Sequence, residues 1–421
     1  MTEPVTAATP SIAGRAAAMR FIMLAVLIDM LAIGVIVPVL PALVGKFTSN
    51  PAEQTYWYGV VTFSFALSSF IGAPILGALS DRFGRRPVLL LGFCGLAINF
   101  FMTALASALW MLIVSRIIGG AMQANAAVAN AYVADITPPQ DRAKRFGMLG
   151  AMFGIGFILG PVIGGLLGGI DLHLPFFVAG GLALLNLAYG VFVLPESLPV
   201  ERRRAFDLRR ANPLSSLKAL AQLKGAGRLV AVLACAGLAQ FTLYTTWVLY
   251  TTFKFQWGPT QNGWSLFAVG IASALVQGVL LGRLLKHFTA QRLAAYGLVS
   301  STLAFIGFGL ATEGWMMYAV IAANLLGNTV AATMQSLISS AAEGNEQGQT
   351  MGAVSGLNSL MAVIAPMFAA PLLGVVSHYP AGDWRIGAPM YFCAALQALA
   401  LAFAVSHFRT VRRTRLAAAS L

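Results

Sequence analysis

The feature that most constrains this chain is a series of twelve apolar segments, each about as long as the ~20-residue helix that crosses a bilayer. They lie near residues 20–44, 56–79, 87–107, 109–134, 144–168, 174–195, 229–252, 261–285, 290–312, 314–341, 349–375 and 386–409. Only 10% of the 421 residues are charged, whereas a soluble domain carries about a quarter. The sequence therefore excludes a soluble, disordered, fibrous or disulfide-stapled protein. It predicts an all-α polytopic membrane protein with twelve transmembrane helices.

The basic residues predict the orientation of these helices. If the N-terminus is cytoplasmic, most of the 27 Lys and Arg residues fall on the cytoplasmic side, and only Lys46, Lys254 and Arg385 fall opposite. The positive-inside rule then places both termini in the cytoplasm, and we expect a multi-pass protein of the inner (cytoplasmic) membrane. The net charge of +13 is explained by topology and by contact with anionic lipid headgroups, so no nucleic-acid partner is expected.

A polar, basic stretch at 196–228 divides six segments from six. We expect an N-terminal six-helix bundle at 1–195, a cytoplasmic linker at 196–228 and a C-terminal six-helix bundle at 229–421. Two such halves are typical of a transporter whose site lies near the bilayer midplane. A weak repeat supports this organisation, because Gly77-Ala-Leu-Ser-Asp81-Arg82 corresponds to Gly278-Val-Leu-Leu-Gly282-Arg283, where the acid is lost.

One acid lies deep in an apolar segment. Of the 14 Asp and Glu residues, all except Asp29 fall in loops, tails or segment ends. An ionised Asp at the centre of a membrane helix costs about 2.5–3.5 kcal/mol, so it usually faces a cavity or a partner. Asp29 is therefore a candidate proton carrier. The alternative is a carboxylate that is permanently hydrogen-bonded for helix packing.

Arg116 is the matching embedded base, in the fourth segment. Its fixed positive charge could tune the proton affinity of a nearby carboxylate. The alternative is a structural tie to backbone carbonyls. Asp29 and Arg116 enter the membrane from opposite faces, so a direct ion pair is not assumed.

The loop after the second segment carries a specific motif. Gly84 permits a tight turn, Asp81 can cap the N-terminus of another helix, and Arg85 can pair with a second acid, for which Asp135 is the natural candidate. Such a lock holds two bundles in one state and breaks in the other. The alternative is a basic anchor without a gating role. The predicted gate motif comprises Gly77, Asp81, Arg82, Gly84, Arg85, Arg86 and Asp135.

The fifth segment is rich in glycine and contains a proline. Small residues at four-residue spacing let helices approach closely, and proline adds a bend. Generic packing explains most of these glycines, but one run is more compact than packing requires. It comprises Gly156, Gly160, Pro161, Gly164 and Gly165.

These residues together resemble the major facilitator superfamily, and within it the twelve-helix drug:proton antiporters. The loop motif, Arg116 with the following Gly119-Gly120, and the Gly-Pro run of the fifth segment each resemble a signature of that group. The stretches 29–41 and 131–137 are similar to the tetracycline-resistance branch, whose members exchange a drug–metal chelate for a proton. The resemblance implies multidrug or antibiotic efflux coupled to protons, with a functional role for the acid at Asp29.

The sequence departs from that branch at two positions. Tetracycline exporters usually carry acids where this chain has Asn99 and Ser301. Their loss weakens the case for a divalent chelate, because hard cations prefer anionic oxygen ligands. We therefore expect the drug-export fold and proton coupling, and treat tetracycline itself as a subordinate hypothesis.

Polar and aromatic side chains in central segments are candidates for the substrate cavity. Amides and aromatics with little charge suit a neutral or amphipathic molecule, although hydrogen bonds between helices explain any single one equally well. The candidates are Asn99, Gln123, Asn125, Gln240, Tyr244, Trp247, Gln277, Asn324 and Asn328.

The residues favour a transporter over other membrane proteins. An enzyme is disfavoured because no His, Cys and carboxylate cluster lies in the segments. ATP-driven pumping by this chain alone is disfavoured because no GxxxxGK[ST] loop occurs. A channel needs a continuous polar path, and a sensor would not need the gate motif. We predict a monomeric exporter, with no cofactor or metal, that exchanges a small molecule for protons by alternating access. The closest alternative is an exporter of a metabolite or a sugar, or a tetracycline-like protein that does not carry tetracycline.

Overall fold

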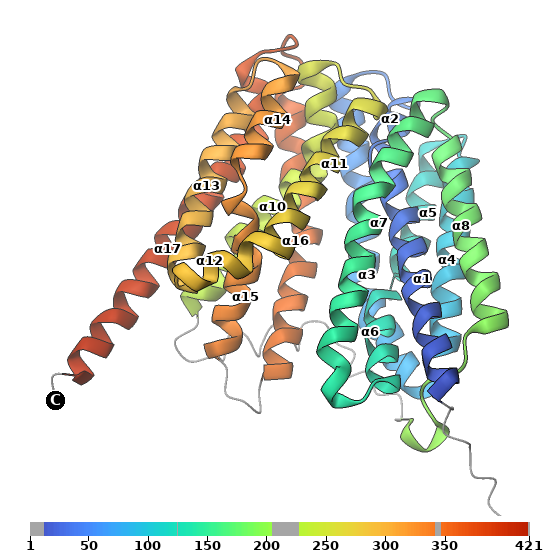
Figure 1. Cartoon of the computed structure of the whole chain (residues 1–421). Coiled ribbons are helices and arrows are strands. Elements are labelled where there is room, and N and C mark those ends of the chain that lie inside the picture. The colour runs from blue at the N-terminus through green and yellow to red at the C-terminus, as the bar shows by residue number, and fades with distance from the viewer. Residues whose placement is uncertain (1–11, 124, 204–226, 342–346, 420–421) are drawn as a thin grey trace, which may run out of the picture. The chain divides into compact units, whose positions relative to one another are not determined.

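The computed structural model describes residues 12–123, 125–203, 227–341 and 347–419, and its regular elements are all helices in that part of the chain (Figure 1). Eleven of these helices are long and apolar enough to cross a membrane, or up to 12 if one bent pair counts as a span. The all-α membrane fold expected from the hydropathy pattern is confirmed. Most of the expected linker lies outside the described residues.

The chain divides into two compact units. Unit 1 comprises residues 1–39 and 67–212, and unit 2 comprises 40–66 and 213–421, where described. Thus α3 (Pro51–Phe83) contributes to both, and residues 40–66 group with the later helices. Unit 1 contains α1 (Ile12–Ile36), α4 (Arg85–Ala104), α5 (Leu109–Ala121), α6 (Asn125–Ile136), η1 (Pro139–Asp141), α7 (Arg142–Ile170), α8 (Leu174–Val193) and η2 (Val200–Arg202).

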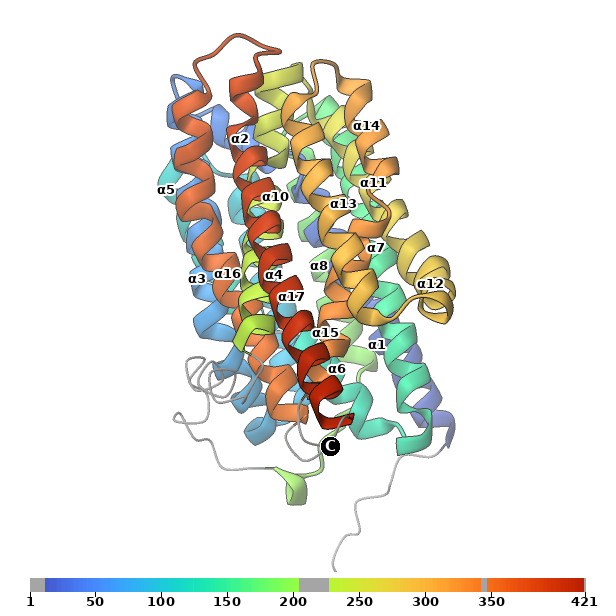
Figure 2. The same cartoon turned by 90° about the vertical axis from the view of Figure 1, so that its left-hand side faces the viewer.

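Unit 2 is built from the remaining helices. They are α2 (Leu40–Gly45), α10 (Gly227–Phe255), α11 (Pro259–Leu275), η3 (Val276–Leu280), α12 (Leu281–His287), α13 (Ala290–Leu310), α14 (Gly314–Ala323), η4 (Leu326–Thr329), α15 (Val330–Ala341), α16 (Gln347–Val376), η5 (Trp384–Gly387) and α17 (Ala388–Ala419). Helix α17 packs against both α10 and α13 (Figure 2).

Proline ends the first helix earlier than the hydropathy pattern predicts. The expected segment runs to residue 44, but α1 stops at Ile36 and the separate helix α2 begins at Leu40. Pro38 lies in the intervening turn, where the Val39 amide donates to the Ile36 carbonyl at 3.2 Å. Because proline has no N–H group and clashes with the preceding turn, it breaks the helix here.

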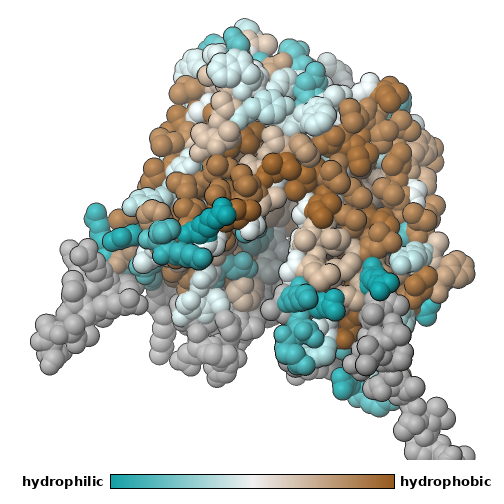
Figure 3. All heavy atoms as spheres, in the orientation of Figure 1, coloured by the Kyte–Doolittle hydropathy of each residue, from teal (hydrophilic) through white to brown (hydrophobic). Residues whose placement is uncertain are grey.

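Each unit buries its own apolar core and exposes apolar residues outside it. Phe21, Phe93 and Tyr132 lie in the core of unit 1, and Leu298 and Met334 lie in that of unit 2. Large apolar side chains also remain exposed, as the hydrophobic surface in Figure 3 shows. A soluble protein would hide such a surface, whereas lipid tails cover it in a membrane.

The fourth span of each half is interrupted. In unit 1, α5 ends at Ala121 and α6 begins at Asn125. In unit 2, α14 and the segment that follows it bend by 50° after Ala323. Interrupted helices at corresponding positions of two repeats indicate where a transporter binds its cargo, because freed backbone groups must line a cavity or be satisfied by side chains.

Candidate functional site

The embedded acid of unit 1 is buried and hydrogen-bonded. Asp29 on α1 is only 4% exposed, and the side-chain amide of Asn125 donates to its Oδ1 at 3.1 Å. Asn125 is the first residue of α6, directly after the interruption of the fourth span. A side chain at Gly92 on α4 would overlap the Asn125 amide oxygen, so this glycine leaves room for the amide beside Asp29.

The glycine-rich run of α7 packs against the helix that carries Asp29. A Cβ atom on Gly160 would lie 2.7 Å from the Gly34 Cα atom, and one on Gly164 would overlap the Val35 carbonyl. Pro161 contacts Gly34, and Gly165 is buried in the same helix. The predicted antiporter motif therefore sets how closely α1 and α7 approach.

Arg116 lies on a polar face of α5 that turns toward α4. Its side chain is buried, and Gly119 follows at a spacing that keeps it on the same helix face. Gln123 is half-buried and lies after the end of α5. A Cβ atom on Gly119 would lie 2.7 Å from Asn99 Cγ. Asn99 is 1% exposed, and neither of its amide atoms has a hydrogen-bond partner in the part of the chain that is described. Asn99 and Gly119 therefore lie at the contact between α4 and α5.

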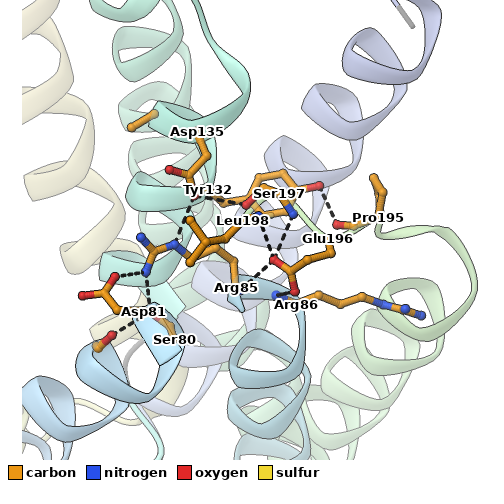
Figure 4. A network of polar contacts seen from close by, with 12 residues as sticks. Ser80, Asp81, Arg85, Arg86, Tyr132, Asp135, Pro195, Glu196, Ser197 and Leu198 are labelled. Carbon is orange, nitrogen blue, oxygen red and sulfur yellow. Dashed lines mark hydrogen bonds and ion pairs between the residues drawn. The ribbon is translucent and has the colours of Figure 1, made fainter. Parts of the chain in front are cut away.

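The gate motif forms an ion-pair network in unit 1 (Figure 4). The Arg85 guanidinium lies between two acids, with Nη1 at 2.6 Å from Asp81 Oδ1 and Nε at 3.1 Å from Asp135 Oδ2. Nη1 also donates to Ser80 Oγ at 2.6 Å. Because a guanidinium has several donors in a fixed plane, one side chain holds the end of α3 to α6.

The N-terminus of α4 is capped by an acid that the sequence pattern did not reveal. Glu196 Oε1 accepts from the Arg85 amide at 2.8 Å, and Oε2 accepts from the Arg86 amide at 3.2 Å (Figure 4). The same carboxylate accepts from the amides of Ser197 and Leu198. A carboxylate at a helix N-terminus satisfies amide groups that lack a partner in the helix and favours the helix dipole.

Asp81 lies four residues before Arg85, and its carboxylate reaches the Arg85 side chain. Its expected role as the cap of another helix stays a prediction. Gly84, between them, has a φ of 106°, and a side chain there would overlap Glu196 Oε2. The turn therefore needs glycine both for its backbone conformation and for space.

A second set of contacts joins the ends of α4 and α8. Arg86 Nη2 donates to the Val191 carbonyl at 2.6 Å, so Arg86 caps the end of α8 while Glu196, which follows α8, caps the start of α4. Tyr132 donates to the Pro195 carbonyl, and Ser197 donates to Asp135. Of the predicted motif, Gly77 has open space around it, and the Arg82 guanidinium lies over the Phe83 ring.

The candidates on α10 and η3 of unit 2 differ in their surroundings. Trp247 is buried and its indole N–H donates to Ser265 at 2.9 Å. Gln277 is exposed and donates to Ser273 in its own helix. Tyr244 is 49% exposed, and Gln240, one turn earlier, is half-buried. Tyr244 and Gln240 are thus the accessible polar pair on α10.

The interruption in unit 2 is held by amide groups. Asn324 follows α14 directly, and its Oδ1 accepts from Ser300 at 3.0 Å. The Asn328 amide donates to the Asn324 carbonyl at 3.3 Å. A side chain at Gly327 would overlap both Asn324 and Ser301. Asn324 and Asn328 therefore lie together at the break, as Asp29 and Asn125 do in unit 1.

The helical units, the buried carboxylate and the interrupted spans together define a membrane transporter. Residues 22–366 match the family model described as the Major Facilitator Superfamily. The tetracycline resistance protein, class C, of Escherichia coli is 36% identical over 367 residues, which cover 87% of this chain and 92% of that protein. Multidrug resistance protein 2 of Bacillus subtilis is 28% identical over 366 residues, which cover 84% of this chain and 88% of that protein.

Solved structures support the same fold. A crystal structure of a bacterial homologue of the human lysosomal transporter Spinster, in an inward-facing and unoccupied conformation, matches with a TM-score of 0.76 at 16% identity and covers 95% of this chain and 98% of that one. This chain belongs to the major facilitator superfamily, whose members are transporters of small molecules rather than enzymes. It is a multi-pass membrane protein related to tetracycline-resistance and multidrug-efflux proteins.

Proposed function

We propose that this protein exports a small amphipathic molecule, such as a drug or antibiotic, in exchange for protons. It would do so by alternating access, as a monomer in the inner (cytoplasmic) membrane, with two six-helix bundles at 1–195 and 229–421 joined by the linker 196–228. The observation that carries the proposal is the buried Asp29 carboxylate and its hydrogen bond from Asn125.

Asn125 suits a carboxyl group that changes its protonation state. An amide can donate to a carboxylate through its nitrogen and accept from a carboxylic acid through its oxygen. Asp29 would therefore have a partner in both states, which limits the cost of moving a proton on and off inside the membrane. Arg116 lies on α5, which precedes α6 in the same span. Its fixed positive charge would favour the ionised form of Asp29.

The Asp81–Arg85–Asp135 network would hold one conformational state. Protons from outside and substrate from inside would favour different states, and a ligand shifts such an equilibrium only by its differential affinity for the two. The Glu196 cap supports this role, because it fixes the first turn of α4, from which the Arg85 side chain extends.

The relatives support an amphipathic drug as the substrate. Their names record tetracycline and multidrug resistance, and the polar groups of unit 2 that are candidates for the substrate cavity are neutral amides, a phenol and an indole. Tetracycline is the narrower hypothesis. Since Asn99 and Ser301 are neutral where tetracycline exporters usually carry acids, we expect a metal-free drug to be carried better than a drug–metal chelate.

Proton flux in inverted vesicles tests this proposal. Vesicles with wild-type protein would be exposed to tetracyclines, fluoroquinolones, phenicols and lipophilic cations, beside Asp29→Asn and the control Asp141→Asn, which removes an exposed acid. We expect substrate-dependent proton release with the wild type and the control, and none with Asp29→Asn. Unchanged flux in Asp29→Asn would overturn the coupling role. If the folded wild type released no protons with any compound of the panel, the result would instead favour a metabolite exporter.

A further inference from the structure

The loop after α11 in unit 2 repeats the gate motif of unit 1 without its acid. Gly278 and Gly282 correspond to Gly77 and Asp81. The helix passes through a π-helical turn, η3, and continues as α12 (Figure 1). Single π-helical turns occur frequently at functional sites. The side chains around η3 are therefore candidates for a functional role.

The turn presents cations that have no acid near them in sequence. Arg283 and Lys286 share a face of α12, Arg292 lies on the first turn of α13, and all three are exposed. No Asp or Glu occurs from residue 208 to 312, and Glu313 lies beyond the far end of α13, roughly 30 Å from Arg292 at ~1.5 Å per residue. In unit 1, by contrast, Arg85 is bonded to Asp81 and Asp135.

Exposed apolar and aromatic side chains lie beside these cations. Leu285 is 46% exposed, Phe288 38% and Tyr296 49%, and the rings of Phe288 and Tyr296 pack edge to face with centroids 5.9 Å apart. Figure 3 shows hydrophilic side chains over α12 at the border of the hydrophobic surface. Aromatic rings beside basic groups are typical of the depth at which lipid headgroups meet the acyl chains.

We propose that this surface, the α12 patch, binds the headgroup of an anionic phospholipid. The patch comprises Arg283, Lys286, Arg292, Leu285, Phe288 and Tyr296. Arg283, Lys286 and Arg292 bind the lipid phosphate through charge-assisted hydrogen bonds. Leu285 and the paired rings contact the upper part of the acyl chains. The acid that neutralises the motif in unit 1 is absent here, so lipid takes its place as the counter-charge.

Lipid binding to the purified full-length protein tests the proposal without reference to transport. Native mass spectrometry would measure binding of phosphatidylglycerol and of phosphatidylcholine with the same acyl chains. The variant Arg283→Gln/Lys286→Gln/Arg292→Gln should lose about tenfold or more in affinity for phosphatidylglycerol, with phosphatidylcholine unchanged. The tail control, Arg412→Gln/Arg413→Gln/Arg415→Gln, removes the same charge from the C-terminal end of α17, and should retain phosphatidylglycerol binding.

A second variant adds an acid instead of removing bases. A Cβ atom added at Gly282 would meet no other atom within 4 Å, so Gly282→Asp fits, and its carboxylate reaches Lys286 four residues on as Asp81 reaches Arg85. We expect a severalfold lower affinity for phosphatidylglycerol. Equal loss in the tail control would show general surface attraction and overturn the site. Unchanged binding in both patch variants would overturn it as well.

Discussion

The two units share an interrupted fourth span but differ in the charge that they bury. In unit 1 the interruption lies beside Asp29, and Arg116 is buried one helix turn or more before it. In unit 2 the corresponding break is lined by the neutral side chains Ser300, Asn324 and Asn328. Because embedded charge is costly, the charged side chains near the break of unit 1 and the neutral ones at the break of unit 2 support our proposal that unit 1 handles the proton, while unit 2 offers neutral groups to the substrate.

The loops that carry the repeated motif differ in the same direction. In unit 1 the basic loop is bonded to three acids, whereas the loop of unit 2 exposes its cations. The backbone differs as well, because Gly84 separates α3 from α4 whereas Leu285, at the corresponding position, lies inside α12. The difference teaches that a sequence repeat need not preserve a charge network, since a network needs every partner in place.

The largest expected effect concerns the glycines of α7 in unit 1, the unit that carries Asp29. Gly164→Leu places a side chain on the Val35 carbonyl, which belongs to the backbone and cannot move aside as a side chain can. We expect a loss of stability of about 3 kcal/mol or more, measured as thermal unfolding and as the yield of monodisperse protein. Gly154→Leu, in the same helix but with open space around it, should change stability by less than about 0.5 kcal/mol. Equal tolerance of both would contradict the proposed packing of α1 on α7.

A smaller effect is expected from the ion-pair network, which unit 2 lacks in its described residues. Arg85→Gln removes both ion pairs of the guanidinium, and Asp135→Asn removes the one that the two variants share. A double-mutant cycle of thermal unfolding should therefore give a coupling energy of about 1 kcal/mol for the Arg85–Asp135 pair. Arg85→Lys should restore only part of it, since an ammonium cannot hold both acids in one plane. The control is Arg145→Gln, whose guanidinium contacts only the Met148 sulfur among the bonds described. Additive effects of Arg85→Gln and Asp135→Asn would remove the network as a source of stability.

Much of the fold could be predicted because a bilayer leaves few alternatives. Apolar length alone predicts helices that cross it, and the single deep acid could be found by elimination. The proximity of Arg85 to Asp135 followed from charge and motif. The early end of α1 was missed, although Pro38 carried the signal, because hydropathy does not record helix breakers.

The Glu196 cap could not be predicted from side-chain chemistry, because its partners are backbone amides more than 100 residues away. A backbone amide has no sequence signature. The one available signal was an isolated acid directly after Pro195, at the start of a basic stretch. The positions of Asn99 and Gln123 were equally hidden, since an amide in an apolar segment suits a cavity and a helix contact alike.

The most local effect that we predict concerns this cap, and it separates the roles of charge and shape. Glu196→Gln keeps one acceptor oxygen but removes the charge, so α4 should remain folded while its first turn opens more often. Loss of a helix cap costs about 0.5–2 kcal/mol, which corresponds to a roughly 2- to 30-fold faster exchange of the Arg85 and Arg86 amides. Hydrogen exchange with mass spectrometry would measure this in the peptide that contains them, with Glu201→Gln as a control at a nearby exposed acid. Exchange should also rise at Ser197 and Leu198, whose amides donate to the same carboxylate. If only Ser197 and Leu198 were affected, Glu196 would organise its own loop but not α4, and the link from the end of α8 to the Arg85 network would fail.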